Sequence, residues 1–303
     1  NMLSYILRRI WQMVPTLLGV ILLIFFLFKF FGGDPVEIMA GLKSSPERIA
    51  SLRAQLGLDK PVWEQLWVFV QQVFTFNWGK SWTTNESIAT IFATRLPATL
   101  TIMVPILVLE VVLAILAGLA VAYVRGSLTD RAIMILTTVA LSISFLVYII
   151  VGQYLFGFVL GWFPVQGWGS GLAENLFRYA ALPILIGLAV GIAPSLRLYR
   201  TFVLDEINQD YVRTARAKGL SENRTMWVHV LRNASIPIIT NIMASLPGLL
   251  IGAFLIERFF SIPGIGREVI LAVERSDFPV IKAITVYVAA ATMVFNLLAD
   301  LMY

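Results

Sequence analysis

Residues 99–124, TLTIMVPILVLEVVLAILAGLAVAYV, form an apolar run with a single ionisable residue, Glu110. A membrane-spanning helix needs about 20 predominantly apolar residues, so this run is long enough to cross a bilayer. Five further runs of this kind occur in the chain. The six predicted spans are residues 10–31, 99–124, 132–161, 180–197, 236–256 and 281–302. The predicted fold is therefore an all-α, polytopic membrane protein with about six transmembrane helices.

The composition excludes several other classes of protein. Of the 303 residues, 58% are hydrophobic and only 14% are charged, against roughly 25% charged residues in soluble domains. An ordinary soluble enzyme is therefore excluded. The chain has no cysteine and one histidine, His229. Disulfides, thiolate metal sites and multi-histidine metal sites are excluded as well. We expect His229 to form hydrogen bonds in a loop rather than to act in catalysis.

The loop charges predict the orientation of the spans. The long loop between Lys29 and Arg95 is set aside, because loops of that length are translocated largely regardless of charge. Most of the remaining basic residues then lie in the segments that a cytoplasmic N-terminus would place inside. We therefore predict that both termini are cytoplasmic.

The spans and loops predict three regions. These are an N-terminal segment with the first span (1–31), an extracytoplasmic loop domain (32–98), and a five-helix core (99–303) with a long cytoplasmic loop (198–235). In the loop domain, Ser45-Pro46 is typical of a helix start and Gly57 of a helix end. A second helix is predicted from near Pro61. Its tryptophans either pack within their own domain or lie in the lipid interface.

The loop 198–235 has an ordered pattern that a basic, membrane-adjacent segment does not require. Two short helices are predicted, at 210–218 and 222–231, with a break at Gly219. Glycine at such a break permits a positive φ or a close approach of the backbone.

Residues 210–220, DYVRTARAKGL, and residues 229–234, HVLRNA, resemble the cytoplasmic EAA loop of binding-protein-dependent ABC importer permeases. Within that family the chain is similar to the dipeptide, oligopeptide and nickel branch. Arg213-Thr214-Ala215 stands where other branches have Glu-Ala-Ala. The resemblance extends over nearly the whole chain. It includes LRR at 7–9 with Pro15-Thr16, GDP at 33–35, LGLDKP at 56–61 and SIPGIG at 261–266.

The resemblance implies a type I ABC importer permease that works by alternating access in a bacterial or archaeal inner membrane. The EAA loop would form a coupling helix that docks in a cleft of an ATPase subunit. The residues expected to serve that coupling are Asp210, Tyr211, Arg213, Thr214, Ala215, Arg216, Ala217, Lys218, Gly219 and Arg232. The implied partners are a second homologous permease, one or two ABC ATPases that hold ATP and magnesium, an extracytoplasmic binding protein and membrane lipid. No cofactor, metal or nucleic acid is expected on this chain.

The substrate implied by the branch is a dipeptide, a longer peptide, a nickel chelate or a sugar. The segment 261–266 combines the fixed φ of a proline with two glycines. We expect it to form an extracytoplasmic turn that serves as a gate. The residues predicted for this gate are Ser261, Pro263, Gly264 and Gly266.

The chain is not expected to hydrolyse ATP itself. Gly79-Lys80-Ser81 has the ending of a phosphate-binding loop, but Phe74 stands where the first glycine of that motif belongs. The energy for transport would therefore come from another subunit or from an ion gradient.

Glu110 lies in the middle of a span, where an ionisable group is costly. One interpretation is a protonated or hydrogen-bonded carboxyl between helices, and the other is a group that lines the pathway and meets a cationic substrate. The Gly187/Gly191 pair predicts close helix packing, and Gly248/Gly252 predicts either packing or a flexible point in the pathway. A gradient-driven secondary transporter is the alternative function, and an intramembrane enzyme is disfavoured by the lone histidine.

Overall fold

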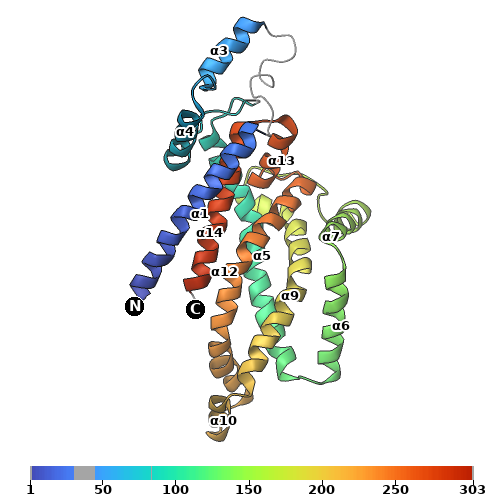
Figure 1. Cartoon of the computed structure of the whole chain (residues 1–303). Helices are drawn as coiled ribbons and strands as arrows, with labels where there is room; N and C mark the ends of the chain where they lie inside the picture. Colours follow the sequence, from blue (N-terminus) through green and yellow to red (C-terminus); the bar gives the residue numbers. More distant parts are fainter. Residues whose placement is uncertain (1, 31–44, 83, 302–303) are drawn as a thin grey trace. The chain divides into compact units, whose positions relative to one another are not determined.

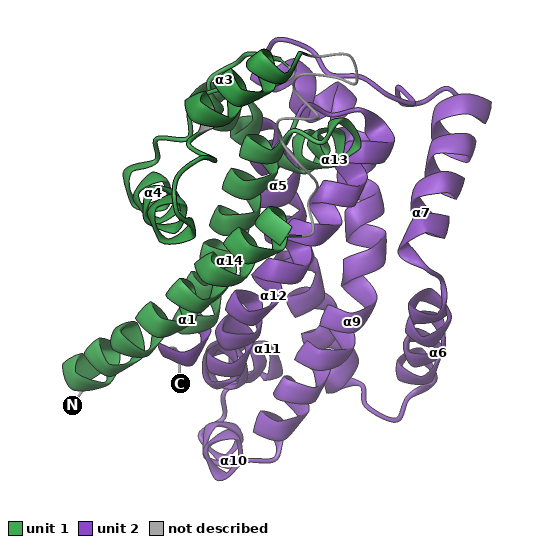
Figure 2. Cartoon of the chain, turned by 45° about the horizontal axis from the view of Figure 1, so that its top comes forward, with its two compact units in different colours: residues 1–97, 264–297 green, residues 98–263, 298–303 purple. Residues whose placement is uncertain are grey.

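The computed structural model describes residues 2–30, 45–82 and 84–301 (Figure 1). All the secondary-structure elements longer than a single bridge among these residues are helices. The chain divides into two compact units (Figure 2). One unit comprises residues 1–97 and 264–297, and the other comprises residues 98–263 and 298–303. Two of the boundaries fall inside helices, α5 (Ile88–Tyr123) and α14 (Phe278–Leu301), and the third falls between residues 263 and 264, outside any helix.

The first unit contains the N-terminal helices, the start of α5, α13 and most of α14. The bounds of its other helices are α1 (Met2–Phe30), α3 (Pro46–Leu56), α4 (Val62–Thr75) and α13 (Ile265–Arg275). The start and end predicted for α3 are confirmed. The Ser45 hydroxyl accepts a hydrogen bond from the Arg48 amide at 3.2 Å, and Gly57 ends the helix with a φ of 74°. The start of α4 after Pro61 is confirmed as well.

Helix α4 has two different faces. Phe69 and Val73 are buried, which confirms packing within its own unit for that face. Trp63 and Trp67 lie on the opposite face, with 71% and 62% of their surfaces exposed. Packing within the unit therefore accounts for one side of this helix, and contact of the other side with the lipid interface stays a prediction.

The second unit contains the remaining helices, of which the π-helical segments are labelled η. Their bounds are α6 (Leu128–Ser142), α7 (Phe145–Gly152), η1 (Gln153–Val159), α8 (Leu172–Glu174), η2 (Asn175–Tyr179), α9 (Ala181–Ile207), α10 (Asp210–Ala217), α11 (Glu222–Arg224), η3 (Thr225–Val230) and α12 (Leu231–Phe260).

Five helices of the described residues are long and apolar enough to cross a membrane, and a sixth span results if the bent pair α6 and α7–η1 counts as one. The region predicted as one span, 132–161, consists of two helices, because the chain turns by 91° between Ser142 and Phe145. Ile143 and Ser144 have extended backbones there. The Ser144 hydroxyl then caps the next helix by accepting a hydrogen bond from the Val147 amide.

The helices that flank the loop 198–235 are longer than predicted. Helix α9 continues to Ile207, and the helix that starts at Glu222 runs through η3 into α12 without a gap. The first short helix of the loop is confirmed as α10. The second is not a separate element, since no helix-ending residue stands between it and the fifth span. Only residues 208–209 and 218–221 lie outside helices here.

Close packing of α9 on α5 explains the Gly187/Gly191 pair. A Cβ at Gly187 would collide with the Ile106 side chain, and one at Gly191 would collide with the Glu110 carboxylate. The predicted small-residue face is therefore confirmed, and α5 is its partner. The core of this unit continues along α12, where Ile256 and Phe260 are almost completely buried.

Candidate functional site

The first candidate site is the loop that carries α10. Gly219 ends the α10 segment with a φ of 82°, and its amide donates to the Arg216 carbonyl at 3.0 Å. A Cβ at this position would meet no atom within 4 Å. Of the two reasons predicted for glycine here, the positive φ is correct and the close backbone approach is wrong.

One face of α10 anchors the loop to the helices that flank it. Val212 is buried in a cluster with Met226, Val230 and Val203 from the neighbouring helices, and Ala215 is buried on the same face of α10. The resemblance placed Ala215 among the docking residues, but its side chain faces inward. Val212 was not predicted as a site residue. The spacing of the two apolar residues, three apart on a short polar helix, is the signal that could have identified this face.

The opposite face of α10 is open to solvent. Arg213 has 78% of its side chain exposed, and its guanidinium lies 3.8 Å from the Asp210 carboxylate. The other exposed residues predicted for coupling are Asp210, Thr214, Arg216, Ala217, Lys218, Gly219 and, on α12, Arg232. These residues form the surface on which a partner could dock.

Two residues predicted to dock form contacts within the loop. The Arg216 guanidinium lies 3.2 Å from the Glu222 carboxylate, across the turn at Gly219. The Tyr211 hydroxyl donates a 2.6 Å hydrogen bond to Glu206 at the end of α9. Burial, together with this bond to a carboxylate, raises the pKa of Tyr211 far above its usual value, so the hydroxyl remains a donor.

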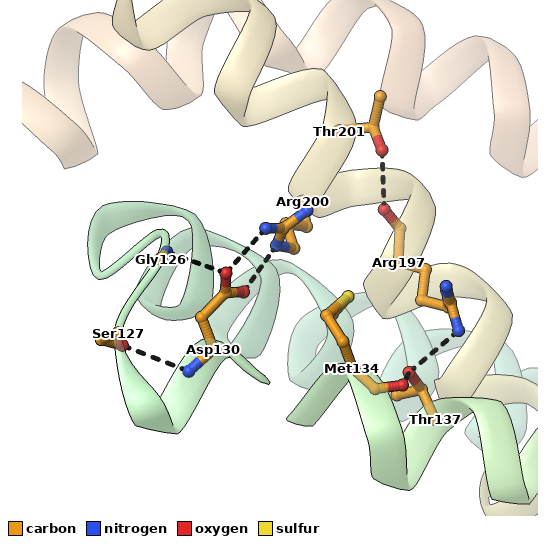
Figure 3. Close-up of polar contacts among 8 residues, drawn as sticks. All are labelled: Gly126, Ser127, Asp130, Met134, Thr137, Arg197, Arg200 and Thr201. Carbon is orange, nitrogen blue, oxygen red and sulfur yellow. Dashed lines mark hydrogen bonds and ion pairs between the residues drawn. The ribbon is translucent and has the colours of Figure 1, made fainter. Parts of the chain in front are cut away.

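A buried ion pair ties α6 to α9 in the same unit (Figure 3). Arg200 donates two hydrogen bonds of 2.9 Å to the two carboxylate oxygens of Asp130. The Gly126 amide donates to the same carboxylate at 3.0 Å, and Ser127 caps α6. This pair was not among the predicted site residues. The Ser-x-x-Asp spacing at the start of α6, typical of a capped helix, was the available signal.

The second candidate site is a cavity of about 520 Å³ between α5, α7, α9 and α12. Its walls are mostly apolar. The polar side chains that line it are Glu110, Ser195, Tyr199, Asn241 and Ser245. The Ser195 hydroxyl donates a 2.5 Å hydrogen bond to Glu110. The Glu110 carboxyl is thus hydrogen-bonded between helices and also lines a cavity, and its contact with a substrate stays a prediction.

Gly248 and Gly252 line the same cavity. A Cβ at Gly248 would meet nothing within 4 Å, and one at Gly252 would only touch the Phe145 ring at 4.0 Å. Within the described chain, these glycines do not mark a tight helix contact. Their position agrees with the other interpretation, a place along the pathway.

The segment 261–266 forms the turn from α12 to α13. Its positive φ belongs to Ser261, at 53°, and not to either glycine. Gly264 has an ordinary φ of −104° as the cap of α13, and Gly266 lies in the first turn of that helix. A turn is present in this segment, as predicted, and its left-handed residue is the serine.

No group of three or more histidine, cysteine or acidic side chains that could hold a metal ion occurs among the residues that the structure describes. His229 lies half-buried in η3, where its carbonyl accepts a hydrogen bond from Asn233.

Comparison with known proteins relates these features to a family. Residues 114–303 match the family described as "Binding-protein-dependent transport system inner membrane component". Residues 2–103 match the family described as "Binding-prot-dependent transport system membrane comp, N-term".

Individual relatives match over nearly their whole length. The "Di/tripeptide transport system permease protein DppB" of Pseudomonas aeruginosa is 36% identical, over 100% of this chain and 97% of its own. The "Dipeptide transport system permease protein DppB" of Lactococcus lactis is 36% identical over 99% and 97%, and that of Escherichia coli K12 is 36% identical over 100% and 97%. The chain therefore belongs to the family of binding-protein-dependent transport system inner membrane components, and it is a multi-pass permease of an ABC importer.

Proposed function

We propose that this permease moves di- or oligopeptides across the inner membrane by alternating access, driven by ATP hydrolysis on separate subunits. The peptide substrate is supported by the printed names of the relatives, which are dipeptide or di/tripeptide permeases. It is also supported by the cavity, whose volume of about 520 Å³ suits a small peptide. In this proposal Glu110, held by Ser195, meets the charged amine of the peptide.

The observation that carries the coupling proposal is the two-sided character of α10. Its buried face carries Val212, which packs against Val203 of α9 and against Met226 and Val230 of the helix that continues into α12. Its exposed face, with Arg213 and Thr214, is free to enter a cleft of an ATPase. A movement of that ATPase would therefore be passed to two membrane-spanning helices that also line the cavity.

The remaining assignments complete this proposal. Both termini and α10 face the cytoplasm, and residues 32–98 form an extracytoplasmic domain between the first span (1–31) and the core (99–303). Ser261, Pro263, Gly264 and Gly266 form the extracytoplasmic gate. The assembly contains a second homologous permease, one or two ABC ATPases with ATP and magnesium, and an extracytoplasmic binding protein. The alternative, a gradient-driven transporter, is set aside because the family depends on a binding protein.

The test is uptake of a labelled dipeptide by proteoliposomes that contain the purified assembly. Arg213→Glu reverses a charge on the exposed face of α10, and Arg224→Glu makes the same change on α11, outside that face. We expect the first variant to lose ATPase association and the second to retain it. Equal association and vanadate-sensitive uptake in both variants would overturn the coupling proposal.

Glu110→Gln tests the substrate proposal separately. It keeps the volume and hydrogen-bonding capacity of the side chain but removes the charge. We expect weaker uptake of a dipeptide with a free amine and a smaller effect on its N-acetylated form, with ATPase association unchanged. An equal loss for both substrates would contradict a contact with the amine.

A further inference from the structure

Helix α4 lies beside the end of a membrane span. Lys29 is in the last turn of α1, and its ammonium donates a 2.8 Å hydrogen bond to Gln65 of α4. The 29 residues of α1 are about 44 Å long, longer than the hydrocarbon core of about 30 Å. A lysine at the end of a span lies at the membrane surface, so α4 is at that level.

The outer face of α4 has the composition of a membrane-interface helix. One face of this helix carries Trp63, Trp67 and Phe74, which follow one another at helical spacing. Their surfaces are 71%, 62% and 63% exposed. Tryptophan is enriched at the boundary between lipid and water, because its ring is apolar and its N–H is polar. This face is therefore suited to the same level of the bilayer that the contact with Lys29 indicates.

A cavity of about 480 Å³ lies on the other side of α4, within the same unit. Its walls come from α1, the end of α3, α4, the segment 78–82 and the start of α14. Lys60, Lys80 and Lys282 line it, together with Trp78 and Trp82, and none of its described lining residues is acidic. The cavity is thus cationic and partly aromatic.

The lysines of this cavity have no carboxylate partner among the residues that the structure describes. The Lys282 ammonium lies over two aromatic rings, 5.8 Å from the centre of Phe69 and 5.9 Å from that of Phe28. Aromatic faces attract a cation but do not neutralise it. An anion that entered the cavity would therefore gain charge-assisted hydrogen bonds from these ammonium groups.

The walls are held in place before any ligand binds. The Trp82 amide donates to Asp277 at 3.0 Å, and the Ser81 hydroxyl donates to the same carboxylate. The Trp78 ring nitrogen donates to the Tyr287 hydroxyl at 3.0 Å. These bonds fix the segment that carries Lys80 onto α14 and the residue before it, so the binding of a ligand there would require little further ordering of the chain.

We propose that this cavity binds the phosphate headgroup of an anionic phospholipid, on the side of the membrane where α1 ends. The lysines contact the phosphate, and the tryptophans of α4 enter the surrounding lipid interface. A lipid is the occupant because the cavity is both cationic and at the level of the headgroups. A soluble anion would explain the charge but not the exposed tryptophans.

The experiment measures lipid association of the full-length permease in micelles that contain spin-labelled phosphatidylglycerol or phosphatidylcholine. The wild type is expected to restrict phosphatidylglycerol preferentially. Lys60→Gln/Lys80→Gln should lower that preference by at least about fivefold, since each lysine near an anionic lipid contributes about that factor. Both side chains are exposed, so the fold should tolerate the change.

Arg48→Gln is the matched control, because it removes a charge from exposed α3 in the same unit but does not line the cavity. Lys60→Arg/Lys80→Arg should restore the preference. An unchanged preference in the glutamine variant, or an equal loss in the control, would overturn the proposal.

Two further arms identify the source of the anion. Inorganic phosphate at millimolar concentration should not displace bound phosphatidylglycerol, and Trp63→Ser/Trp67→Ser should weaken binding of this lipid. Displacement by phosphate with no lipid preference would assign the cavity to a soluble anion. A third outcome combines two results: the wild type shows no lipid preference, and the glutamine variant binds the binding protein more weakly than the wild type does. That outcome would assign the cavity to an acidic protein partner.

Discussion

At the scale of single residues, the backbone at Gly219 makes a specific prediction. Its φ of 82° is open to glycine and, with some strain, to asparagine. A Cβ would touch nothing, so a substitution acts through the backbone alone. We expect Gly219→Val to insert in the membrane but lose ATPase association, and Gly219→Asn to retain most of it. Co-purification with the ATPase checks this, and equal behaviour of the two variants would contradict it.

The pair of Asp130 and Arg200 makes a second prediction at this scale. Their side chains are 7% and 17% exposed, and breaking a buried pair from one side typically costs about 3–5 kcal/mol. Asp130→Asn and Arg200→Gln should each lower the midpoint of thermal unfolding in detergent. The double variant should lose less than the sum of the two. Strictly additive losses would show that the two side chains act independently.

Residue-scale prediction succeeded where one position determines the geometry, and it did not identify contacts that depend on a second side chain. Ser45, Gly57 and Gly219 end or begin helices through their own φ or hydroxyl, and all three were identified. Tyr211 and Arg216 were assigned to docking, whereas Glu206 and Glu222 hold them. Which of several nearby charges a side chain meets depends on the path of the backbone, and the sequence pattern does not contain that path.

At the scale of elements, the turn from α12 to α13 leads to a prediction about dipeptide uptake. Ser261 holds the left-handed backbone, so Ser261→Gly should relieve strain and leave uptake intact. Valine at both Gly264 and Gly266 adds bulk at the start of α13 and should reduce dipeptide uptake without loss of ATPase association. Uptake assays on the two variants check this. Normal uptake by the valine variant would contradict the gate and show that the turn only connects the two helices.

The spans show what hydropathy can and cannot establish about elements. Length and apolarity identified each membrane-spanning region, because both follow from the thickness of the bilayer. The bend between α6 and α7 was missed. The residues around Ile143 are as apolar as those of a straight helix, and the change of direction depends on the cap that Ser144 provides. The continuous helix through η3 was also missed. Gly219 marks the break before this helix, and no residue marks the absence of a second break before the fifth span.

At the scale of the whole molecule, the predicted topology is open to direct measurement. The chain has no cysteine, so each introduced thiol is a unique label. Cysteines replace Ser51 on α3 and Arg224 on α11, both exposed positions. In intact cells, an impermeant maleimide should label Ser51→Cys and leave Arg224→Cys unlabelled until the membrane is opened. The reverse pattern would invert the orientation.

The helix from Glu222 to Phe260 is 39 residues long, which corresponds to about 58 Å. It is interrupted by two prolines, Pro237 and Pro247, each of which removes one rung of the hydrogen-bond ladder. The stretch between them carries Asn241 and Ser245, the polar lining of the cavity that comes from α12. A twist applied near Glu222 therefore reaches a section with a flexible joint at either end. That section can rotate relative to the helix on either side of it. A small torsion at one membrane face therefore changes which side chains a solute meets halfway across.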